Sequence, residues 1–300
     1  MSASLVAAGA PIGELRRWAR TALKAAGIAD PVREAEWLLA HVLELPSHAL
    51  LLEGERAVSE LQAERARALI GRRASHEPLQ YLLGTQEFRG LDMAVTPDVL
   101  IPRPETELLV EETLRAIARV SGPRLVDVGT GSGCIAVAVV RERPDATMYA
   151  LDISAPALAV ARANAIRHGT FDRIRFVRTD LLGAFSARAR ERFDVIVSNP
   201  PYIAVGELDG LQPEVAHYEP RVALAAGADG LVYYRRLLRE VPMLLKPGGC
   251  LIMELGYGQA DSVMSLARTS GAYDSVVCRK DAAGIERVLV ARAGSGGAVA

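Results

Sequence analysis

Four consecutive residues, Asn199-Pro200-Pro201-Tyr202, end an apolar segment at 193–198 and could act on a planar nitrogen. The amide oxygen of Asn199 and a prolyl carbonyl, that of Pro200, can both accept hydrogen bonds from an NH2 group. Pro200 and Pro201 fix the backbone, and the Tyr202 ring can pack on a planar group. An amide nitrogen is a poor nucleophile because its lone pair is delocalised, so two fixed acceptors would orient it towards an electrophile. The alternative is a plain turn, since Asn-Pro and Pro-Pro often end strands.

A glycine-rich segment, Gly129-Thr130-Gly131-Ser132-Gly133, follows another apolar run, with Asp127 two residues before its first glycine. Glycines permit a tight turn and let a ligand approach the backbone closely. The pattern differs from the dinucleotide fingerprint G-x-G-x-x-G, because Cys134 stands where the last glycine belongs. It also lacks the Gly-Lys-Ser/Thr of a phosphate-binding P-loop. Alone, the segment is only a weak indication of ligand binding.

Two acids, Asp152 and Asp180, end the next two apolar runs. An acid about 20 residues beyond the glycine segment is where nucleoside-binding sheets hold a ribose diol. Ser154 can cap the following helix, which leaves Asp152 for a ligand. The carboxyl ends of parallel strands share one edge of a sheet, so these acids, the glycine segment and Asn199 should meet there. We therefore predict a nucleoside cofactor in that crevice.

The elements that must position these residues alternate between strands and helices after Glu105. Five apolar runs read as strands buried in a parallel sheet, and two more strands are expected near 275–280 and 286–292. The expected strands are RLVDVG, TMYALDI, IRFVRTD, FDVIVSN and CLIMEL, then SVVCRK and ERVLVAR. This order predicts an α/β fold with a doubly wound sheet.

The N-terminal part has a helical pattern between residues 12 and 73, with Asp30-Pro31 and Ser59 with Gln62 as helix-start signals. Trp18 and Trp37 are expected in its core. We predict an all-α domain at 1–75, a hairpin-containing linker at 76–104, the α/β domain at 105–293 and a disordered tail at 294–300. The helical part shows no catalytic cluster.

Composition excludes several classes of protein. The chain has 300 residues, of which 50% are hydrophobic and 24% charged, with a net charge of −1. This is an ordinary globular balance, and it argues against a basic nucleic-acid binder. Three scattered cysteines form no disulfide framework or zinc motif, and the five histidines share no metal-like spacing, so no metal is expected. No apolar run is long enough to span a bilayer, and the N-terminus lacks a signal-peptide pattern, so we expect a cytoplasmic protein without membrane partners.

Taken together, DVGTGSG, LDIS, Asp180 and SNPPY resemble a class I S-adenosylmethionine-dependent methyltransferase that modifies a planar nitrogen. SNPPY is shared by adenine-N6 DNA methyltransferases and protein glutamine-N5 methyltransferases. The segments PLQYLLG (78–84), IPRPETE (101–107) and 215–237, with the helical N-terminal part, resemble the peptide chain release factor N5-glutamine methyltransferase (PrmC/HemK) family. The resemblance covers residues 12–293. It implies a seven-stranded Rossmann-like sheet and transfer of a methyl group from S-adenosyl-L-methionine to the glutamine of a release factor's Gly-Gly-Gln motif.

Residue by residue, the resemblance implies that Gly129, Thr130, Gly131, Ser132 and Gly133 lie against the methionine part of the cofactor. Asp152 would hold the ribose, and Asp180 and Leu181 would flank the adenine; some relatives have Trp in place of Leu181. Asn199 would face both cofactor and substrate, with Asn199 and Pro200 in the catalytic step. The substrate glutamine would be bound by Asn199, Pro200, Pro201 and Tyr202, and buttressed by Pro102, Arg103, Pro104 and Glu105.

Other functions remain open at this point. A ribosomal-protein glutamine N5-methyltransferase is the nearest alternative, although IPRPETE favours the release-factor branch. A DNA adenine-N6 methyltransferase fits less well, because the chain has a slight negative charge and no large basic segment, and no stable nucleic-acid binding is expected. A non-catalytic cofactor-binding scaffold is a third alternative. The expected partners are bacterial release factors, docked by the helical domain.

Overall fold

The computed structural model describes residues 9–185 and 193–294. By its internal contacts the chain divides into two compact units. Unit 1 comprises the chain up to Gly84 together with Gln212–Tyr218, and unit 2 comprises Thr85–Leu211 and the chain from Glu219 onwards. The predicted tail at 294–300 lies outside the described residues, except for its first residue.

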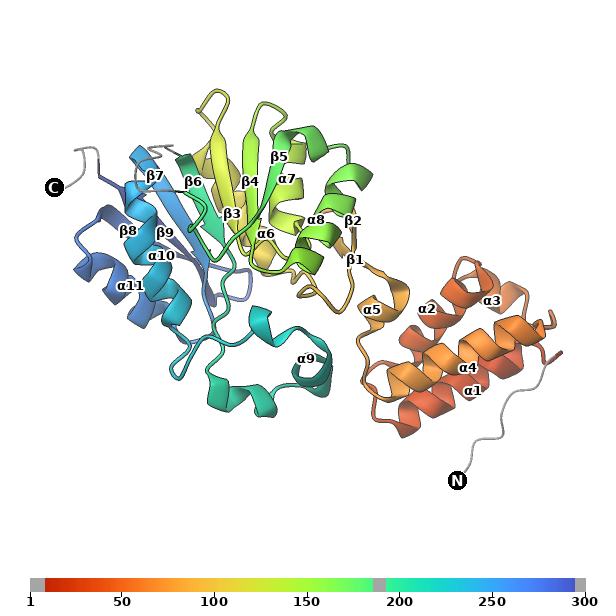
Figure 1. Cartoon of the computed structure of the whole chain (residues 1–300). Coiled ribbons are helices and arrows are strands. Elements are labelled where there is room, and N and C mark those ends of the chain that lie inside the picture. Colours follow the sequence, from red (N-terminus) through yellow and green to blue (C-terminus); the bar gives the residue numbers. More distant parts are fainter. Residues whose placement is uncertain (1–8, 186–192, 295–300) are drawn as a thin grey trace. The chain divides into compact units, whose positions relative to one another are not determined.

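Unit 1 is helical, and two of its helices, α2 (Pro31–Leu43) and α4 (Glu60–Ala74), begin at the predicted start signals (Figure 1). Asp30 caps one helix by accepting a hydrogen bond from the Arg33 N–H, and Ser59 and Gln62 form a complete capping box. Buried aliphatic side chains from these helices form one core. The helices are α1 (Ile12–Ala25), α2 (Pro31–Leu43), α3 (Ala49–Leu52), α4 (Glu60–Ala74), α5 (Leu79–Leu83) and α9 (Pro213–Tyr218).

The prediction for the two tryptophans is wrong for Trp37. Trp18 packs partly buried against the core of unit 1, but the Trp37 side chain is 42% exposed. The Arg33 guanidinium lies 5.2 Å from the Trp37 ring centroid. A cation over the indole face stabilises the ring at the surface, so this aromatic residue does not need the core.

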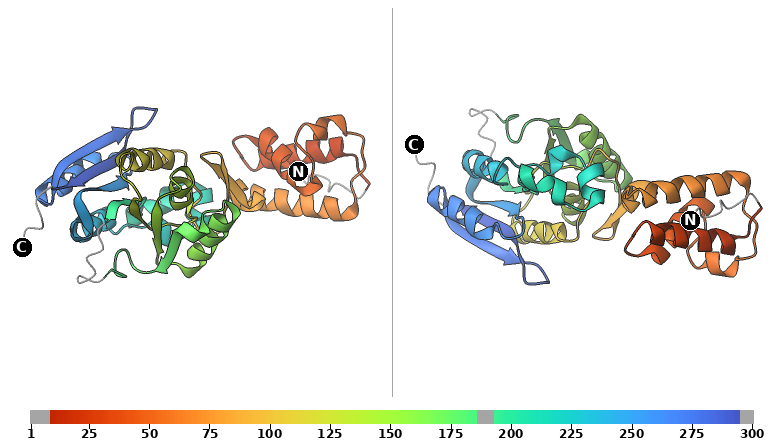
Figure 2. Two further views of the ribbon diagram at one scale, coloured as in Figure 1. Left: turned by 90° about the horizontal axis from the view of Figure 1, so that it is seen from above. Right: turned by 90° about the horizontal axis from the view of Figure 1, so that it is seen from below.

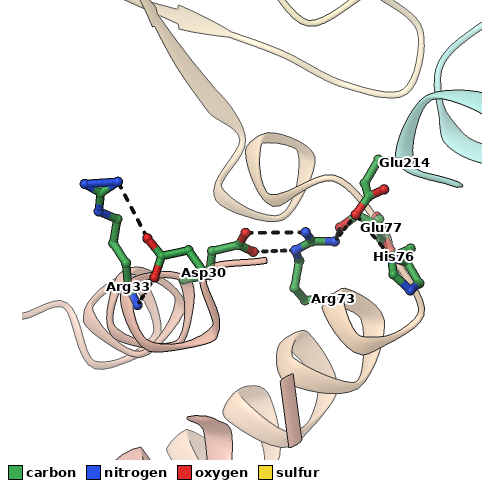
Figure 3. A network of polar contacts seen from close by, with 7 residues as sticks. Asp30, Arg33, Arg73, His76, Glu77 and Glu214 are labelled. Carbon is green, nitrogen blue, oxygen red and sulfur yellow. Dashed lines mark hydrogen bonds and ion pairs between the residues drawn. The ribbon is translucent and has the colours of Figure 1, made fainter. Parts of the chain in front are cut away.

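Helix α9 comes from the part of the chain between two segments of unit 2, yet it is held within unit 1 by polar contacts (Figure 3). Arg73 at the end of α4 pairs with Glu34 of α2 and, at 3.1 Å, with Glu214 of α9. His76 Nδ1 lies 3.1 Å from the same Glu214 oxygen. The Arg73 side chain is only 7% exposed, so its two carboxylate partners compensate a charge that water barely reaches.

Unit 2 is built on a seven-stranded mixed sheet, as predicted. The strand order is β5-β4-β3-β6-β7-β9-β8, with parallel pairing from β5 to β7 and antiparallel pairing of β9 with β7 and β8. Figure 2 shows β8 and β9 as a paired ribbon at one side of this unit. The strands are β3 (Arg124–Val128), β4 (Thr147–Asp152), β5 (Ile174–Arg178), β6 (Phe193–Ser198), β7 (Leu245–Glu254), β8 (Tyr273–Lys280) and β9 (Glu286–Ala293).

Alternating side chains on the strands separate the core of unit 2 into two layers. One layer joins the sheet to α6 (Thr106–Ala116) and α7 (Cys134–Glu142), with α8 (Ala155–Arg167) beside them. The other joins it to α10 (Val232–Glu240) and α11 (Ala260–Thr269). On β7, Cys250 and Ile252 face the first layer, whereas Leu251 and Met253 face the second. Glu254 therefore continues the side that faces α6.

The range 76–104, where the sequence predicted a hairpin, contains the antiparallel pair β1 (Thr85–Phe88) and β2 (Leu91–Ala94). Asn164 of α8 is fully buried and connects this hairpin to the glycine segment. Its amide bonds both the N–H and the C=O of Ala94 and donates to the Ser132 carbonyl at 2.8 Å. The hairpin thus helps to fix the loop that follows β3. None of the helices in the described ranges is long and apolar enough to cross a membrane.

Candidate active site

A pocket in unit 2 lies at the carboxyl ends of β3, β4, β5 and β6. Most of the residues singled out in the sequence line it together: Gly129, Thr130, Gly131, Ser132, Asp152, Asp180, Leu181, Asn199 and Pro201. These positions come from four separate strand ends, which is the arrangement expected of a ligand crevice in an α/β sheet. Pro102 and Arg103 also line the pocket.

Three predicted site residues are not among those that line the pocket: Gly133, Pro200 and Tyr202. A Cβ at Gly133 would come within 3.0 Å of the Ala161 Cβ, and its φ of 79° is left-handed. The close approach of α8 therefore requires glycine there. Pro200 is buried. The Tyr202 carbonyl accepts a 2.9 Å hydrogen bond from Gln259, and its ring packs against the core on the α10 side.

Asp152 fastens the glycine segment to the end of β4. One carboxylate oxygen accepts from the Gly131 N–H and the other from the Ser154 N–H, both at 2.9 Å. Ser154 itself caps α8 through Ala157, as the sequence suggested. Asp152 is therefore not free of backbone contacts. Each oxygen keeps a further acceptor position, and the residue lines the pocket.

Asp180 and Leu181 form the neighbouring wall, after β5. Both Asp180 oxygens are engaged by the Arg236 guanidinium of α10, at 3.0 and 2.9 Å. Leu181 has a φ of 45°, a left-handed conformation that is uncommon for a residue with a Cβ. Such strained residues cluster at ligand sites, because the surrounding structure must hold them in place.

Asn199, directly after β6, is held by two buried residues that we had not singled out, Thr106 and Glu254. The Asn199 amide nitrogen donates to the Thr106 hydroxyl at 3.2 Å, and that hydroxyl donates to a Glu254 carboxylate oxygen at 2.7 Å. Thr106 is 2% exposed and Glu254 3% exposed. Burial raises the pKa of Glu254 to about 7, and the nearby Glu105 carboxylate adds to the shift. Hydrogen bonds from Thr106 and from Asn199, together with the Arg287 charge, oppose it.

Arg103 pairs with Glu219 beside the pocket. Its guanidinium donates to both Glu219 oxygens, at 2.7 and 2.8 Å. The Glu219 side chain is 1% exposed and that of Arg103 is 35% exposed. Burial raises the pKa of Glu219, while Arg103 opposes the shift. The pair joins the IPRPETE segment to the segment that precedes Pro220, another residue of the pocket wall.

A second buried acid, Asp127, lies beneath the glycine segment. One of its oxygens accepts from the Thr130 hydroxyl at 2.6 Å, and the other has no hydrogen-bond partner. Burial raises the pKa of Asp127 to about 7; the Thr130 hydrogen bond opposes this and the Asp152 charge adds to it. Asp127 is fully buried and does not line the pocket, so its observed role is to hold Thr130, which does line it.

Sequence reasoning could have identified Glu254 by one signal, an acid that ends an otherwise apolar strand. Thr106 gave less signal, because a threonine at a helix start is common. Among the described residues, no cluster of three or more His, Cys, Asp and Glu side chains could hold a metal ion.

Comparisons with known proteins match both parts of the chain. A model of the PrmC N-terminal domain matches residues 14–84, and a model of the methyltransferase small domain matches residues 104–213. A crystal structure of a methyltransferase from Pyrococcus furiosus has 20% sequence identity and a TM-score of 0.50, over 77% of this chain and 98% of that one. This likeness concerns the fold alone.

Curated relatives are similar over almost their whole length. The chain is 44% identical over 277 residues to a release factor glutamine methyltransferase of Geobacter sulfurreducens, covering 92% of this chain and 95% of the relative. It is also 44% identical over 280 residues to the enzyme of that name from Nitratidesulfovibrio vulgaris, covering 93% of this chain and 94% of the relative. The chain therefore belongs to the release factor glutamine methyltransferase family.

Proposed function

We propose that this protein transfers a methyl group from S-adenosyl-L-methionine to the side-chain nitrogen (N5) of the glutamine in the Gly-Gly-Gln motif of bacterial release factors. The observation that carries the proposal is that Asn199 and Pro201 share one pocket with the glycine segment and Asp152. Methyl transfer needs a nucleophilic nitrogen in line with a bound electrophile, and this pocket offers acceptors for both partners. The names of the curated relatives support the same reaction, and a cytoplasmic location suits a modifier of translation factors.

The pocket fits the cofactor chemically. A Cβ at Gly129 or Gly131 would meet no heavy atom within 4 Å, and both glycines have positive φ, so open backbone is presented there. Asp152 lines the pocket and keeps acceptor positions that suit the ribose hydroxyls. The cofactor supplies an electrophilic methyl group on a positively charged sulfur. Gly129, Thr130, Gly131, Ser132 and Gly133 would hold its methionine part, and Asp152, Asp180 and Leu181 its nucleoside.

On the substrate side, Asn199 would accept a hydrogen bond from the glutamine NH2, so that charge building on nitrogen is stabilised. The second acceptor predicted from the sequence, Pro200, does not line the pocket. Pro201 and Tyr202 would confine the planar amide. No nucleophilic side chain of the enzyme is required, because the substrate nitrogen itself would attack the methyl carbon. The nitrogen–carbon bond would form as the carbon–sulfur bond breaks, with S-adenosyl-L-homocysteine as the leaving group and one N–H proton passing to solvent. The main contribution of the chain is orientation of a weak nucleophile, an effect of proximity and fixed dipoles.

Methyl-transfer assays with labelled cofactor test the proposal. The acceptors to compare are an intact release factor, the same factor with Ala in place of the motif glutamine, a ribosomal protein and DNA. We expect label only in the unmodified release factor. Label in the ribosomal protein or DNA but not in the release factor would refute the assignment. If the factor with Ala in place of the motif glutamine were still labelled, the methylated atom could not be the N5 of that glutamine.

Replacing Asp152 by Ala should weaken cofactor binding. The carboxylate would hold the ribose hydroxyls and also fastens Gly131, and the loss of two charge-assisted hydrogen bonds costs about 2 to 4 kcal/mol. Titration calorimetry with S-adenosylmethionine measures the change, and circular dichroism checks the fold. Asp92→Ala, at an exposed position of β2, is the matched control and should leave affinity unchanged. Wild-type affinity in Asp152→Ala would remove the residue from the cofactor site.

We further propose that unit 1 recognises the folded release factor. Leu51 and Leu52 of α3 are 65% and 82% exposed, so they offer apolar surface without a partner in the described chain. Replacing both leucines by Gln should lower kcat/KM for an intact release factor about 5- to 30-fold. This corresponds to a loss of about 1 to 2 kcal/mol of binding free energy between enzyme and release factor. A short Gly-Gly-Gln peptide should react as with wild type.

The control for this experiment is Ile166→Gln, which changes an equally exposed apolar residue of unit 2 (64%). Point substitutions are preferable to removal of the N-terminal part, because Gln212–Tyr218 belongs to unit 1 and would lose its partners. Equal losses on protein and peptide would assign unit 1 a supporting role instead of docking.

A further inference from the structure

The contacts of Asn199 form a chain of hydrogen bonds with a defined direction. It begins at the buried Glu254 carboxylate, passes through the Thr106 hydroxyl at 2.7 Å, and reaches the Asn199 amide at 3.2 Å. All three residues belong to unit 2. The topology explains the meeting: β6 and β7 are parallel neighbours, and the first residue of α6 lies over their carboxyl ends.

The direction of this chain follows from which groups can donate. An ionised carboxylate only accepts hydrogen bonds, so the single hydroxyl proton of Thr106 points to Glu254. The Thr106 oxygen then has only lone pairs to offer to Asn199. The atom of Asn199 that faces Thr106 must therefore be its NH2 group. This argument fixes the orientation of an amide whose oxygen and nitrogen are otherwise hard to distinguish.

The orientation matters for the proposed reaction. The NH2 group of the substrate glutamine donates hydrogen bonds, so Asn199 must offer it an acceptor. If the Asn199 amide were flipped, its own NH2 group would face the substrate NH2 group, and neither could accept. With its nitrogen engaged by Thr106, Asn199 has its oxygen left for the pocket that it lines. We propose that Glu254, acting through Thr106 and through its own hydrogen bond from the Asn199 NH2 group, is a positioning residue that keeps the Asn199 amide oxygen directed at the substrate nitrogen.

This inference rests on the proposed function for its kinetic part, but its structural part is independent of the substrate. The surroundings of Glu254 support a fixed role. Its backbone carbonyl accepts from the Tyr234 hydroxyl at 3.1 Å, and the same hydroxyl accepts from the Gly256 N–H at 3.1 Å. The end of β7 is thus fastened to α10, so the carboxylate has little freedom to turn away from Thr106.

The state of Glu254 should make turnover depend on pH. Above the pKa of about 7 the carboxylate accepts from Thr106, whereas below it the protonated acid can donate, and Thr106 can then donate to Asn199 and favour the flipped amide. Charged and titratable groups facing Glu254 are Glu105, Arg287, Tyr202, Tyr234 and Cys134. Burial raises the pKa of Tyr202 and Cys134 to about 12 and that of Tyr234 as well, so none of these three titrates near pH 7.

Three variants of the full-length enzyme separate the possible roles. Thr106→Val keeps the shape and removes the hydroxyl, and we expect kcat to fall about 10- to 100-fold, the range that outer-shell partners cost at other sites. Thr106→Ser keeps the hydroxyl and should restore most of the rate. Glu254→Gln keeps an acceptor without the titrating charge, so it should flatten the rise of kcat between pH 6 and pH 8 (about one unit either side of the pKa). Asp127 has a similar pKa but is unchanged in this variant, so a rise that persists would overturn the assignment to Glu254.

Cofactor affinity is measured alongside and should stay at its wild-type value in Thr106→Ser and Thr106→Val. The melting temperature should stay near wild type in Thr106→Ser and fall in Thr106→Val, where the buried Glu254 carboxylate loses a donor, so kcat is compared at a temperature at which both variants are folded. Equal losses of kcat in these two variants would overturn the inference, because packing and not the hydroxyl would then matter. A wild-type kcat in Thr106→Val would overturn it as well. Glu254→Met, without an acceptor, should lose rate to the same extent as Thr106→Val, and retention of the wild-type rate would contradict the role of the carboxylate.

A spectroscopic measurement tests the orientation without substrate. The side-chain NH2 resonance of Asn199 is identified by its absence in Asn199→Ala. We expect slow proton exchange for this group in the wild-type enzyme and faster exchange in Thr106→Val. Unchanged exchange in Thr106→Val would refute the chain of hydrogen bonds. If the wild-type enzyme labels no release factor, the proposed function fails, and this measurement alone then decides the inference about Glu254.

Discussion

Replacing Asn199 by Ala is expected to lower kcat about 100- to 1000-fold while the enzyme still binds its cofactor. The amide oxygen is proposed to stabilise charge that develops on the substrate nitrogen, and removal of one such preorganised group costs rates of about that size. Since the interaction strengthens in the transition state, the loss should appear in kcat more than in KM. Single-turnover methylation of a release factor measures it, and calorimetry measures cofactor affinity.

Asp152→Ala is the matched counterpart of this variant, because both residues line the same pocket. It should raise the dissociation constant of the cofactor, whereas Asn199→Ala should leave that constant near its wild-type value. The two patterns distinguish a role in chemistry from a role in binding. A near wild-type rate for Asn199→Ala would contradict the catalytic role and favour the alternative, that the Asn-Pro-Pro-Tyr segment is a simple turn at the end of β6.

The sheet and the meeting of its strand ends could be predicted from the sequence, because each depends on local patterns. Continuous apolar runs alternating with helical segments leave few topologies other than a parallel sheet with helices on both faces. Once that topology holds, the carboxyl ends of neighbouring strands share an edge. Residues as distant in sequence as Gly131 and Asn199 then line one pocket, as the structure shows.

The residues that hold Asn199 could not be predicted in the same way. Thr106 and Glu254 are 148 positions apart, and their contact depends on where α6 crosses the end of β7. From the sequence, Glu254 is predicted only as a member of the strand CLIMEL. The side that it faces follows from the alternation along β7, but its partner follows from helix packing, which no local pattern specifies.

Two further features depended on contacts that a sequence does not display. Trp37 was expected in the core as a large apolar residue of the helical part, but the helix turns it outwards towards Arg33. Helix α9 comes from the chain between two segments of unit 2, but it belongs to unit 1, where Glu214 contacts Arg73 and His76 (Figure 3) and the Tyr218 hydroxyl donates to the Ser75 carbonyl. In both cases the observed position goes with contacts to polar residues: Arg33 lies over the Trp37 ring, and Arg73 and His76 contact Glu214 of helix α9.

The role of Arg103, which the sequence left undefined, leads to the other large expected effect. Arg103→Met should lower the free energy of unfolding of unit 2 by about 3 kcal/mol at pH 7. The reason is that Glu219, 1% exposed, would keep a buried charge without its partner. Breaking a buried pair typically costs about 3 to 5 kcal/mol, and the 35% exposure of the Arg103 side chain places this pair at the lower end.

The measurement is urea unfolding followed by circular dichroism, because Trp18 and Trp37 both lie in unit 1 and their fluorescence does not report on unit 2. Arg235→Met is the matched control. Arg235 also pairs with an acid, Asp229, but the two side chains are 47% and 49% exposed, so its loss should change the free energy of unfolding little. Equal effects of the two substitutions would contradict a special cost for the buried pair.

The pH dependence of the Arg103→Met variant provides a sharper test. Burial already raises the pKa of Glu219 in the presence of Arg103, and the pKa should rise further without it. The folded variant then binds a proton that the unfolded chain releases, so its free energy of unfolding should increase as the pH falls from 7 to about 5. The double variant Arg103→Met/Glu219→Gln has no buried charge to compensate. It should therefore recover much of the lost stability at pH 7 and show little of this pH dependence, whereas a penalty that persists unchanged would mean that Arg103 stabilises the pocket wall by packing alone.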